Sequence, residues 1–232
     1  MSRITRPPVV DKIEYPTRDG RPMAETDLHG LLLFALLHTL RTFFFADPGV
    51  YVSGNLLVFY ERGNKRKHVS PDVFVVRGVP NHLRDNYLIW EEKKAPEVVI
   101  ELTSKTTRKE DTDTKFALYR DVLKVKELFL FDPRAEYLDP PFQGYRLRAG
   151  KYVSIKPVGG RLPSRLLGLH LERDGSDLRL WNPATGQWLP TPDEARQQAD
   201  QARQQADQAR QQAEAEVSRL RRENEELRRG LP

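Results

Sequence analysis

Apolar residues follow two periods along the chain, and together they predict an α/β (α+β) fold. Residues 24–42 carry leucines near helical spacing over a broad face, which predicts a well-buried helix, and residues 106–123 predict a second helix. β-Branched and aromatic runs predict strands at residues 50–52, 56–60, 70–76, 96–103 and 127–131, with a polar loop at 78–94. The order strand, helix, strand between residues 96 and 131 favours a crossover unit inside a mixed sheet.

Short hairpins follow this core. Predicted strands at residues 145–147 and 152–155 flank the turn Ala149-Gly150, and those at 169–171 and 178–181 flank Asp174-Gly175. We expect this part of the chain to continue or cap the same domain.

Two of the predicted strands each carry a carboxylate. Asp72 starts one strand, in Ser70-Pro71-Asp72-Val73, and Glu101 stands near the end of another, in Val98-Val99-Ile100-Glu101. If the strands are neighbours, the two acids meet at one edge of the sheet. Two carboxylates held close together are costly unless a cation lies between them. The pair therefore predicts a metal-dependent enzyme with Asp72 and Glu101 as metal ligands.

The chain changes character at Thr191. Thr191-Pro192-Asp193-Glu194 combines an N-cap, a proline at the first helical position and a glutamate three residues after the cap, which predicts a helix start. A seven-residue unit then repeats and forms a heptad seam that a stutter shifts by one position; the seam includes Ala199, Ala206, Val217, Leu220, Asn224 and Leu227. This pattern predicts a coiled coil of about 55–60 Å that makes the protein a homodimer, with Asn224 favouring a parallel pair. A single solvated helix is the alternative.

Composition narrows the class of protein. The 232 residues suit one ordinary domain with an appendage, and the complete lack of cysteine excludes disulfides and cysteine-based zinc sites. The N-terminal residues have no apolar signal core and no apolar stretch could cross a bilayer, so we expect a soluble, cytoplasmic protein. The net charge is +5, of which the part before Thr191 carries +6 and the remainder −1. A mildly basic body is compatible with nucleic acid as a partner.

Basic residues near the two acids would complete a phosphodiesterase site. Mg²⁺ takes about six oxygen ligands, often only one or two of them carboxylates, and it would lower the pKa of a bound water. A nearby lysine would orient that water and offset the charge developing on the phosphate. Candidates are Lys105 and one face of the following helix, which carries Arg108, Asp111, Lys115 and Tyr119. An Asp111–Lys115 surface ion pair is the alternative interpretation of that spacing.

The first predicted helix offers two further groups. Glu25 opens it and could complete the metal site, or it could be a charge favoured by the helix dipole. His29, one turn later, is interpreted as a packed or solvated histidine rather than a ligand.

With these residues in hand, the chain resembles the Uma-two family, described as "putative restriction endonuclease", in the PD-(D/E)XK superfamily. The resemblance runs from about Pro22 to Leu169. It rests on an ordered series: Ser70-Pro71-Asp72, Pro96 to Glu101 with Ser104, Thr107-Arg108, Asp111, Lys115, Tyr119, and Glu127 to Asp132-Pro133. It implies a restriction-endonuclease-like core, with a central mixed sheet flanked by helices, that cuts DNA with Mg²⁺ or Mn²⁺.

The superfamily pattern places a lysine two residues after the second acid, where this chain has Thr103. The resemblance implies that Lys115, on the following helix, takes the role of that lysine as a migrated residue, in preference to Lys105. It also implies Glu25 as the helix-borne acid near the metal.

Three hypotheses describe the function. The first is a metal-dependent DNA endonuclease with an arm at 1–20, a nuclease domain at 21–190 and a dimerising coiled coil at 191–232. Asp72, Glu101 and Lys115 would be its catalytic residues. The second is a catalytically inactive nucleic-acid-binding or scaffold protein on the same fold, which Thr103 motivates. The third is an assembly protein that acts through its C-terminal helix.

Overall fold

A computed structural model describes residues 13–18, 26–104 and 110–229 of the chain. The chain divides into two compact units, Met1–Leu189 and Pro190–Pro232. The helical elements are α1 (Asp27–Phe43), α2 (Ile89–Glu92), the π-helical segments η1 (Glu110–Lys115) and η2 (Leu118–Val122), and α3 (Pro192–Arg229). The strands are β1 (Val50–Ser53), β2 (Val58–Phe59), β3 (His68–Val69), β4 (Val73–Arg77), β5 (Tyr87–Leu88), β6 (Val98–Leu102), β7 (Glu127–Phe131), β8 (Phe142–Arg148), β9 (Lys151–Ser154), β10 (Leu162–Ser164), β11 (Leu169–Asp174), β12 (Asp177–Asn182) and β13 (Gln187–Trp188).

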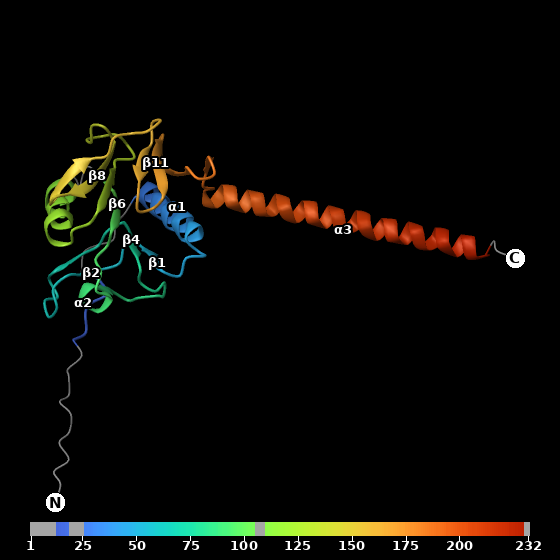
Figure 1. The fold of residues 1–232 in the computed structure, drawn as a ribbon, viewed down its shortest axis with the longest axis horizontal. Coiled ribbons are helices and arrows are strands. Elements are labelled where there is room, and N and C mark those ends of the chain that lie inside the picture. Colours follow the sequence, from blue (N-terminus) through green and yellow to red (C-terminus); the bar gives the residue numbers. More distant parts are fainter. Residues whose placement is uncertain (1–12, 19–25, 105–109, 230–232) are drawn as a thin grey trace, which may run out of the picture. The chain divides into compact units, whose positions relative to one another are not determined.

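A six-stranded mixed sheet forms the centre of the first unit (Figure 1). Its strand order is β1-β4-β6-β7-β8-β9, and only β6 and β7 run parallel among these neighbours. The crossover between β6 and β7 contains η1 and η2, as a parallel pair requires. The predicted crossover unit and the mixed sheet are confirmed.

Two hydrophobic clusters cover the two faces of this sheet. On one face, α1 packs over Val73, Ile100 and Phe129 together with leucines from the four-stranded sheet β10-β11-β12-β13. On the other face, Tyr119 and Leu123 of the crossover pack with residues of the small sheet β3-β2-β5. Side chains alternate along β6, so Ile100 belongs to the first cluster and Val99 to the second. This alternation decides the direction in which Glu101 points.

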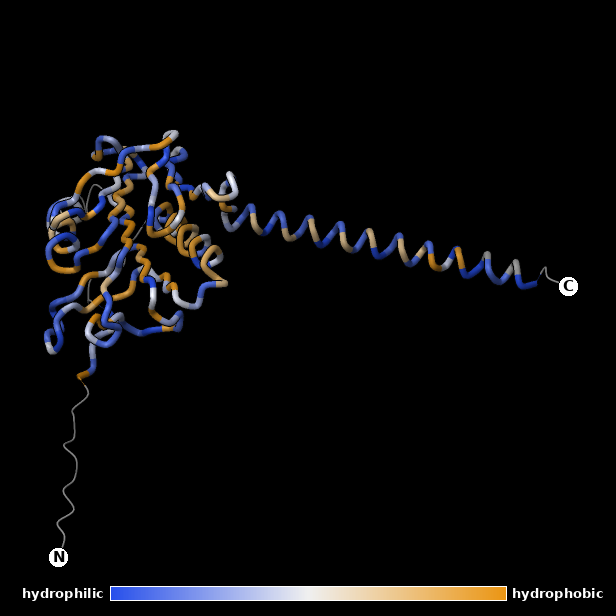
Figure 2. The backbone as a smooth tube through the Cα atoms, viewed as in Figure 1, coloured by the Kyte–Doolittle hydropathy of each residue, from blue (hydrophilic) through white to orange (hydrophobic). Residues whose placement is uncertain are grey.

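The first helix differs from its prediction at its start and in its burial. It begins at Asp27, with Thr26 as the N-cap, whose Oγ1 accepts a hydrogen bond from the His29 backbone N–H at 3.3 Å. Only the side facing the sheet is buried, whereas Leu31 and Phe34 are 67% and 60% exposed. The prediction of a well-buried helix is therefore wrong for one side, although Figure 2 shows that α1 is apolar along much of its length.

Two other segments also differ from their predictions. The polar stretch 78–94 contains β5 and α2, because Tyr87 joins the small sheet through its backbone N–H to Leu57 O at 2.9 Å. The stretch 106–123 is helical where it is described, but most of it is π-helical rather than α-helical. A sequence pattern with a 3.6-residue period does not distinguish the two, since a π-turn adds a single residue.

The second unit is the helix α3, which begins with the predicted capping box. The Glu194 backbone N–H donates to Thr191 Oγ1 at 3.2 Å, and the Thr191 backbone N–H donates to Glu194 Oε2 at 2.9 Å. Figure 2 shows α3 as largely hydrophilic with small apolar positions at intervals. Val217 and Leu220 are 47% and 45% exposed within a single chain. None of the described helices is long and apolar enough to cross a membrane.

Candidate functional site

Asp72 and Glu101 meet where β4 begins, opposite the end of β6. Val73 pairs with Ile100 in this antiparallel ladder, so continuing the register by one residue places Asp72 opposite Glu101. Asp72 is 8% exposed and Glu101 is completely buried. Two buried carboxylates on facing backbone positions need compensating donors or cations. The geometry therefore fits the position predicted for the two acids.

Asp72 is held by backbone and side-chain groups from two elements. Its Oδ2 accepts a hydrogen bond from the Leu102 backbone N–H at 2.7 Å, which ties the carboxylate to the end of β6. Its Oδ1 lies 3.5 Å from Nε2 of His29, in the first turn of α1. The carboxylate is thus fixed between the main sheet and the start of α1.

The backbone at Asp72 is shaped by a close approach from Gly54. A Cβ atom at position 54 would lie only 2.0 Å from the Asp72 carbonyl oxygen. The next backbone N–H, that of Asn55, donates to Pro71 O at 3.0 Å. Glycine at position 54 is therefore required for the chain to pass directly beside the Pro71-Asp72 peptide.

Glu101 has its own set of partners on the crossover. Lys115 Nζ lies 2.9 Å from Glu101 Oε2, and Tyr119 donates a short hydrogen bond from its hydroxyl to Oε1. The Lys115 side chain is 16% exposed, so the ammonium group reaches from the protein surface into the site. The structure thus brings together Asp72, Glu101, Lys115 and Tyr119.

The π-helical crossover positions both of these partners. Lys115 ends η1 and Tyr119 lies in η2, and a π-turn widens the helix so that both side chains reach one carboxylate. Phe116 fixes the segment against the sheet through ring contacts of 5.0 Å to each of Tyr145 and Tyr152. Burial raises the pKa of both tyrosines, so their hydroxyls stay neutral.

Thr103 stands where a lysine was expected from the superfamily pattern. Its backbone N–H and its Oγ1 both donate to Phe131 O, at 2.7 and 3.1 Å, and the residue is 2% exposed. Its side chain is therefore hydrogen-bonded to the last residue of β7. The cationic group at Glu101 comes from Lys115 instead.

The remaining predicted residues are not placed at the site. Glu25, Lys105 and Arg108 lie outside the described residues, and Asp111 is described only as part of η1. Among the described residues, no three acidic or histidine side chains form a group that could hold a metal ion. Two carboxylates with water and a substrate phosphate would still suit Mg²⁺, which keeps several waters in most protein sites. Because an ionised carboxylate offers about four lone-pair sites, Asp72 and Glu101 retain capacity to bind a cation.

Glu97, at the opposite end of β6, is an acid whose contacts we interpret as structural. Glu97 precedes this strand, and burial would raise the pKa of its carboxyl. The hydrogen bonds from Lys126 Nζ and from the Arg77 backbone N–H outweigh that effect and lower the pKa. The Lys126 side chain is 58% exposed, and the pair faces solvent. Glu101 differs because it is fully buried and stands opposite Asp72 in the strand register.

Sequence analysis interpreted His29 as a packed or solvated histidine and did not anticipate its position beside Asp72. A histidine near a helix start has many structural explanations, and nothing local to it points to Asp72, 43 residues later in the sequence. The available signal was its place in the first turn after the Thr26 cap, at the start of a helix that packs on β4. Only the three-dimensional arrangement of α1 and β4 reveals what this position means.

Comparisons with known proteins identify the family of this chain. A family model described as Uma2, "putative restriction endonuclease", matches residues 9–174. A solved structure described as a "putative nuclease belonging to DUF820" from Anabaena variabilis matches with a TM-score of 0.48 and 16% identity, covering 66% of this chain and 81% of that one. No curated protein matches the chain. The family match spans most of the first unit, with both acids, Lys115 and Tyr119, and the chain therefore belongs to the Uma2 family.

Proposed function

We propose that this chain is a divalent-metal-dependent endonuclease that hydrolyses phosphodiester bonds of DNA. The observation that carries the proposal is the cluster of two buried, facing carboxylates with a lysine ammonium 2.9 Å from one of them. Membership in a family described as "putative restriction endonuclease" supports a nuclease. The mildly basic charge of the chain before Thr191 is compatible with a DNA substrate.

Each residue of the cluster has a separate task in this proposal. Asp72 and Glu101 would hold Mg²⁺ or Mn²⁺, with Glu25 as a further ligand. When bound, the metal would lower the pKa of a water and stabilise charge on the phosphate. Lys115 would orient the attacking water through its Nζ and offset the developing negative charge. Tyr119 keeps the Glu101 carboxylate in one orientation by its hydrogen bond, while Lys105, Arg108 and Asp111 are supporting candidates.

A homodimer joined by α3 is part of the proposal. The heptad seam leaves Val217 and Leu220 nearly half exposed in a single chain, as expected for residues that pack against a second helix. Two nuclease sites in one dimer would allow both strands of a duplex to be cut. We place the protein in the cytoplasm.

Cleavage of supercoiled plasmid DNA with Mg²⁺ or Mn²⁺ tests the proposal. We expect wild-type cleavage to fall by about 100-fold or more in Asp72→Asn, Glu101→Gln and Lys115→Met. Glu97→Gln is the matched control, because it alters an acid at the other end of the same strand and should retain full activity. Equal activity in all four variants would reject the assignment of the site.

Metal binding provides an independent measurement. Titration of Mn²⁺ into the wild type should give a binding isotherm that is lost in Asp72→Ala. The alternative function is a catalytically inactive nucleic-acid-binding or scaffold protein, which Thr103 at the expected lysine position favours. DNA binding by a wild-type protein that cleaves no DNA with either metal would support that alternative.

A further inference from the structure

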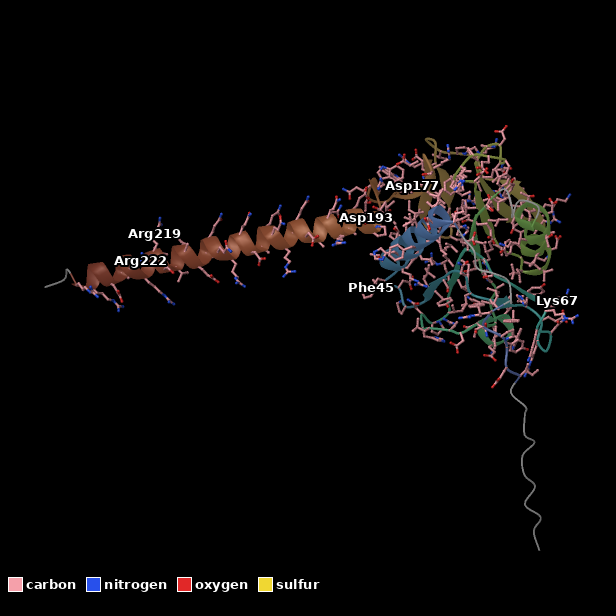
Figure 3. All side chains as sticks on the ribbon, turned by 180° about the vertical axis from the view of Figure 1, so that it is seen from behind. Phe45, Lys67, Asp177, Asp193, Arg219 and Arg222 are labelled. Atoms are coloured by element: carbon pink, nitrogen blue, oxygen red, sulfur yellow. The ribbon has the colours of Figure 1, made fainter. Side chains whose placement is uncertain are left out.

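The outer side of α1 carries an apolar surface that the described residues of the first unit leave exposed. Exposed positions on this helix fall three or four residues apart, so they form one stripe. Leu31 is 67% exposed and Phe34 is 60% exposed. Phe45, two residues after the helix, is 86% exposed, and Figure 3 labels it at the helix end. An apolar stripe of this kind, on a helix that is apolar on its buried side as well, indicates a docking surface.

Gly30 lies on the same stripe, and its surroundings among the described residues are open. A Cβ atom at this position would meet nothing within 4 Å, so the neighbouring structure does not require glycine. Glycine is disfavoured in a helix interior relative to alanine, and a bare backbone lets a second helix approach closely. A helix is therefore a suitable partner for this surface.

We propose that α1 packs antiparallel against α1 of a second copy of this chain, with the two-fold axis at Phe34. Asp27 and Arg41 stand seven residues before and after Phe34, and both are exposed. In an antiparallel pair, Asp27 therefore lies opposite Arg41 of the partner subunit at both ends. Arg41 Nε already donates to Val52 O at 3.1 Å, but a guanidinium has further N–H donors for a carboxylate.

The same register places small against large residues. Gly30 and His38 stand four residues on either side of Phe34, so the glycine of one copy faces the imidazole of the other. His38 stacks on Phe34 with ring centroids 5.9 Å apart, which holds it on this face. The Asp27–Arg41 and Gly30–His38 pairings therefore favour the same alignment, in which the two Phe34 side chains meet at the axis.

The area of the surface explains why this contact would depend on the C-terminal helix. Leu31, Phe34 and Phe45 leave roughly 400 Å² of apolar surface exposed, about half of what one partner buries in a standard interface. Such a contact is weak between free molecules. It becomes populated when a coiled coil already links two copies, because the link raises their effective concentration.

The pairing would bring two candidate sites together. His29, which lies beside Asp72, is five residues before Phe34. In the antiparallel pair the two His29 residues would be about 15 Å apart along the helix axis. Two sites at this spacing could each act on one strand of a short duplex segment. This consequence, unlike the pairing itself, rests on the proposed nuclease function.

Disulfide formation in the full chain tests the pairing directly, since the protein has no cysteine of its own. We would mix a Gly30→Cys chain with an affinity-tagged His38→Cys chain and oxidise them gently. We expect the mixed disulfide to form at least five times faster than with Val158→Cys, a control position that is 58% exposed. Equal rates would overturn the pairing. A faster reaction of Gly30→Cys with Val217→Cys would also overturn it, because α3 would then cover α1.

A plasmid assay tests the consequence for cleavage. Leu31→Ser with Phe34→Ser should lower the yield of linear product about tenfold while nicked circles still form, because each subunit keeps its own site. Val158→Ser serves as the control and should change neither product. If the wild type cuts no DNA, the nuclease proposal fails, yet the disulfide rates still decide the α1 pairing.

Discussion

At the scale of single residues, the stability of the candidate site depends on a buried ion pair. Glu101 is fully buried and has Lys115 as its cationic partner, with Tyr119 as a hydrogen-bond donor. Removing one member of such a pair leaves an uncompensated charge in the interior, which costs more than removing both.

Lys115→Met should therefore lower the free energy of unfolding by about 3 kcal/mol. Adding Glu101→Gln to the same chain should recover most of that loss, because the neutral amide no longer needs a cation. Urea unfolding of the single and double variants measures both values. Lys126→Met, at the exposed Glu97 pair, is the control and should cost less than about 1 kcal/mol. Additive losses in the double variant would contradict the buried-pair account.

Gly54 is the second residue whose replacement has a direct consequence for the site. Gly54→Ala places a Cβ atom 2.0 Å from the Asp72 carbonyl oxygen, so the Asp72 backbone has to move. We expect Mn²⁺ affinity to fall at least tenfold, as a misplaced ligand predicts. Calorimetric titration measures it. Gly49→Ala, where the added Cβ meets only the Asp47 side chain at 3.3 Å, should bind the metal normally.

At the scale of elements, the segment between β4 and β6 is fixed by one ion pair. Arg84 Nε and one of its terminal nitrogens donate to the Glu92 carboxylate at 2.6 and 2.9 Å, and the guanidinium lies 4.1 Å from the centre of the Tyr51 ring. The Arg84 side chain is only 4% exposed. This bidentate pair joins the loop before β5 to α2.

The pair makes the stability of this segment depend on pH. The hydrogen bond from Arg84 lowers the pKa of Glu92 below its usual 4.5. A lowered pKa in the folded state contributes stability above the unfolded pKa, and this contribution is lost as pH falls through the folded value. Glu92→Gln should cost about 2 kcal/mol at pH 7. The difference in the free energy of unfolding between Glu92→Gln and the wild type should shrink below about pH 4.5. Urea unfolding at each pH measures this difference. A constant difference would contradict the account.

The elements also show how much of the structure can be predicted from sequence. The strands next to Asp72 and around Glu101 are apolar runs buried on both faces, which is a strong signal, so both strands were predictable, whereas their adjacency was only a condition of the prediction. β5 has two residues and exists through a partner strand distant in sequence, which no local pattern encodes. The π-helical form of the crossover, from which Lys115 and Tyr119 contact Glu101, is not encoded by a helical period in the sequence. The apolar pattern of α1 predicted burial, and this is correct for the side that faces the sheet, whereas Leu31 and Phe34 on the other side are exposed.

Part of the candidate site was also predictable from the sequence. Asp72, Glu101 and Lys115 were predicted because the first directly precedes a strong strand, the second lies in one and the third follows on the connecting segment. His29 and Gly54 were not, since their contacts with Asp72 come from other elements and depend on the tertiary arrangement.

At the scale of the whole molecule, the proposed homodimer depends on the apolar end of α3. Alanine positions bury little area, so most of the association energy of the proposed coil comes from Val217, Leu220 and the following heptad. Replacing both Val217 and Leu220 by asparagine should shift the protein from dimer to monomer in sedimentation at micromolar concentration. Ser218→Asn with Arg221→Asn changes the adjacent, off-seam positions and should leave the dimer intact. Helix content by circular dichroism controls for unfolding of α3.

A dimer that survives the seam substitutions would mean that the seam does not hold the copies together. A monomer that still nicks plasmid DNA but rarely linearises it would link dimerisation to cleavage of the second strand.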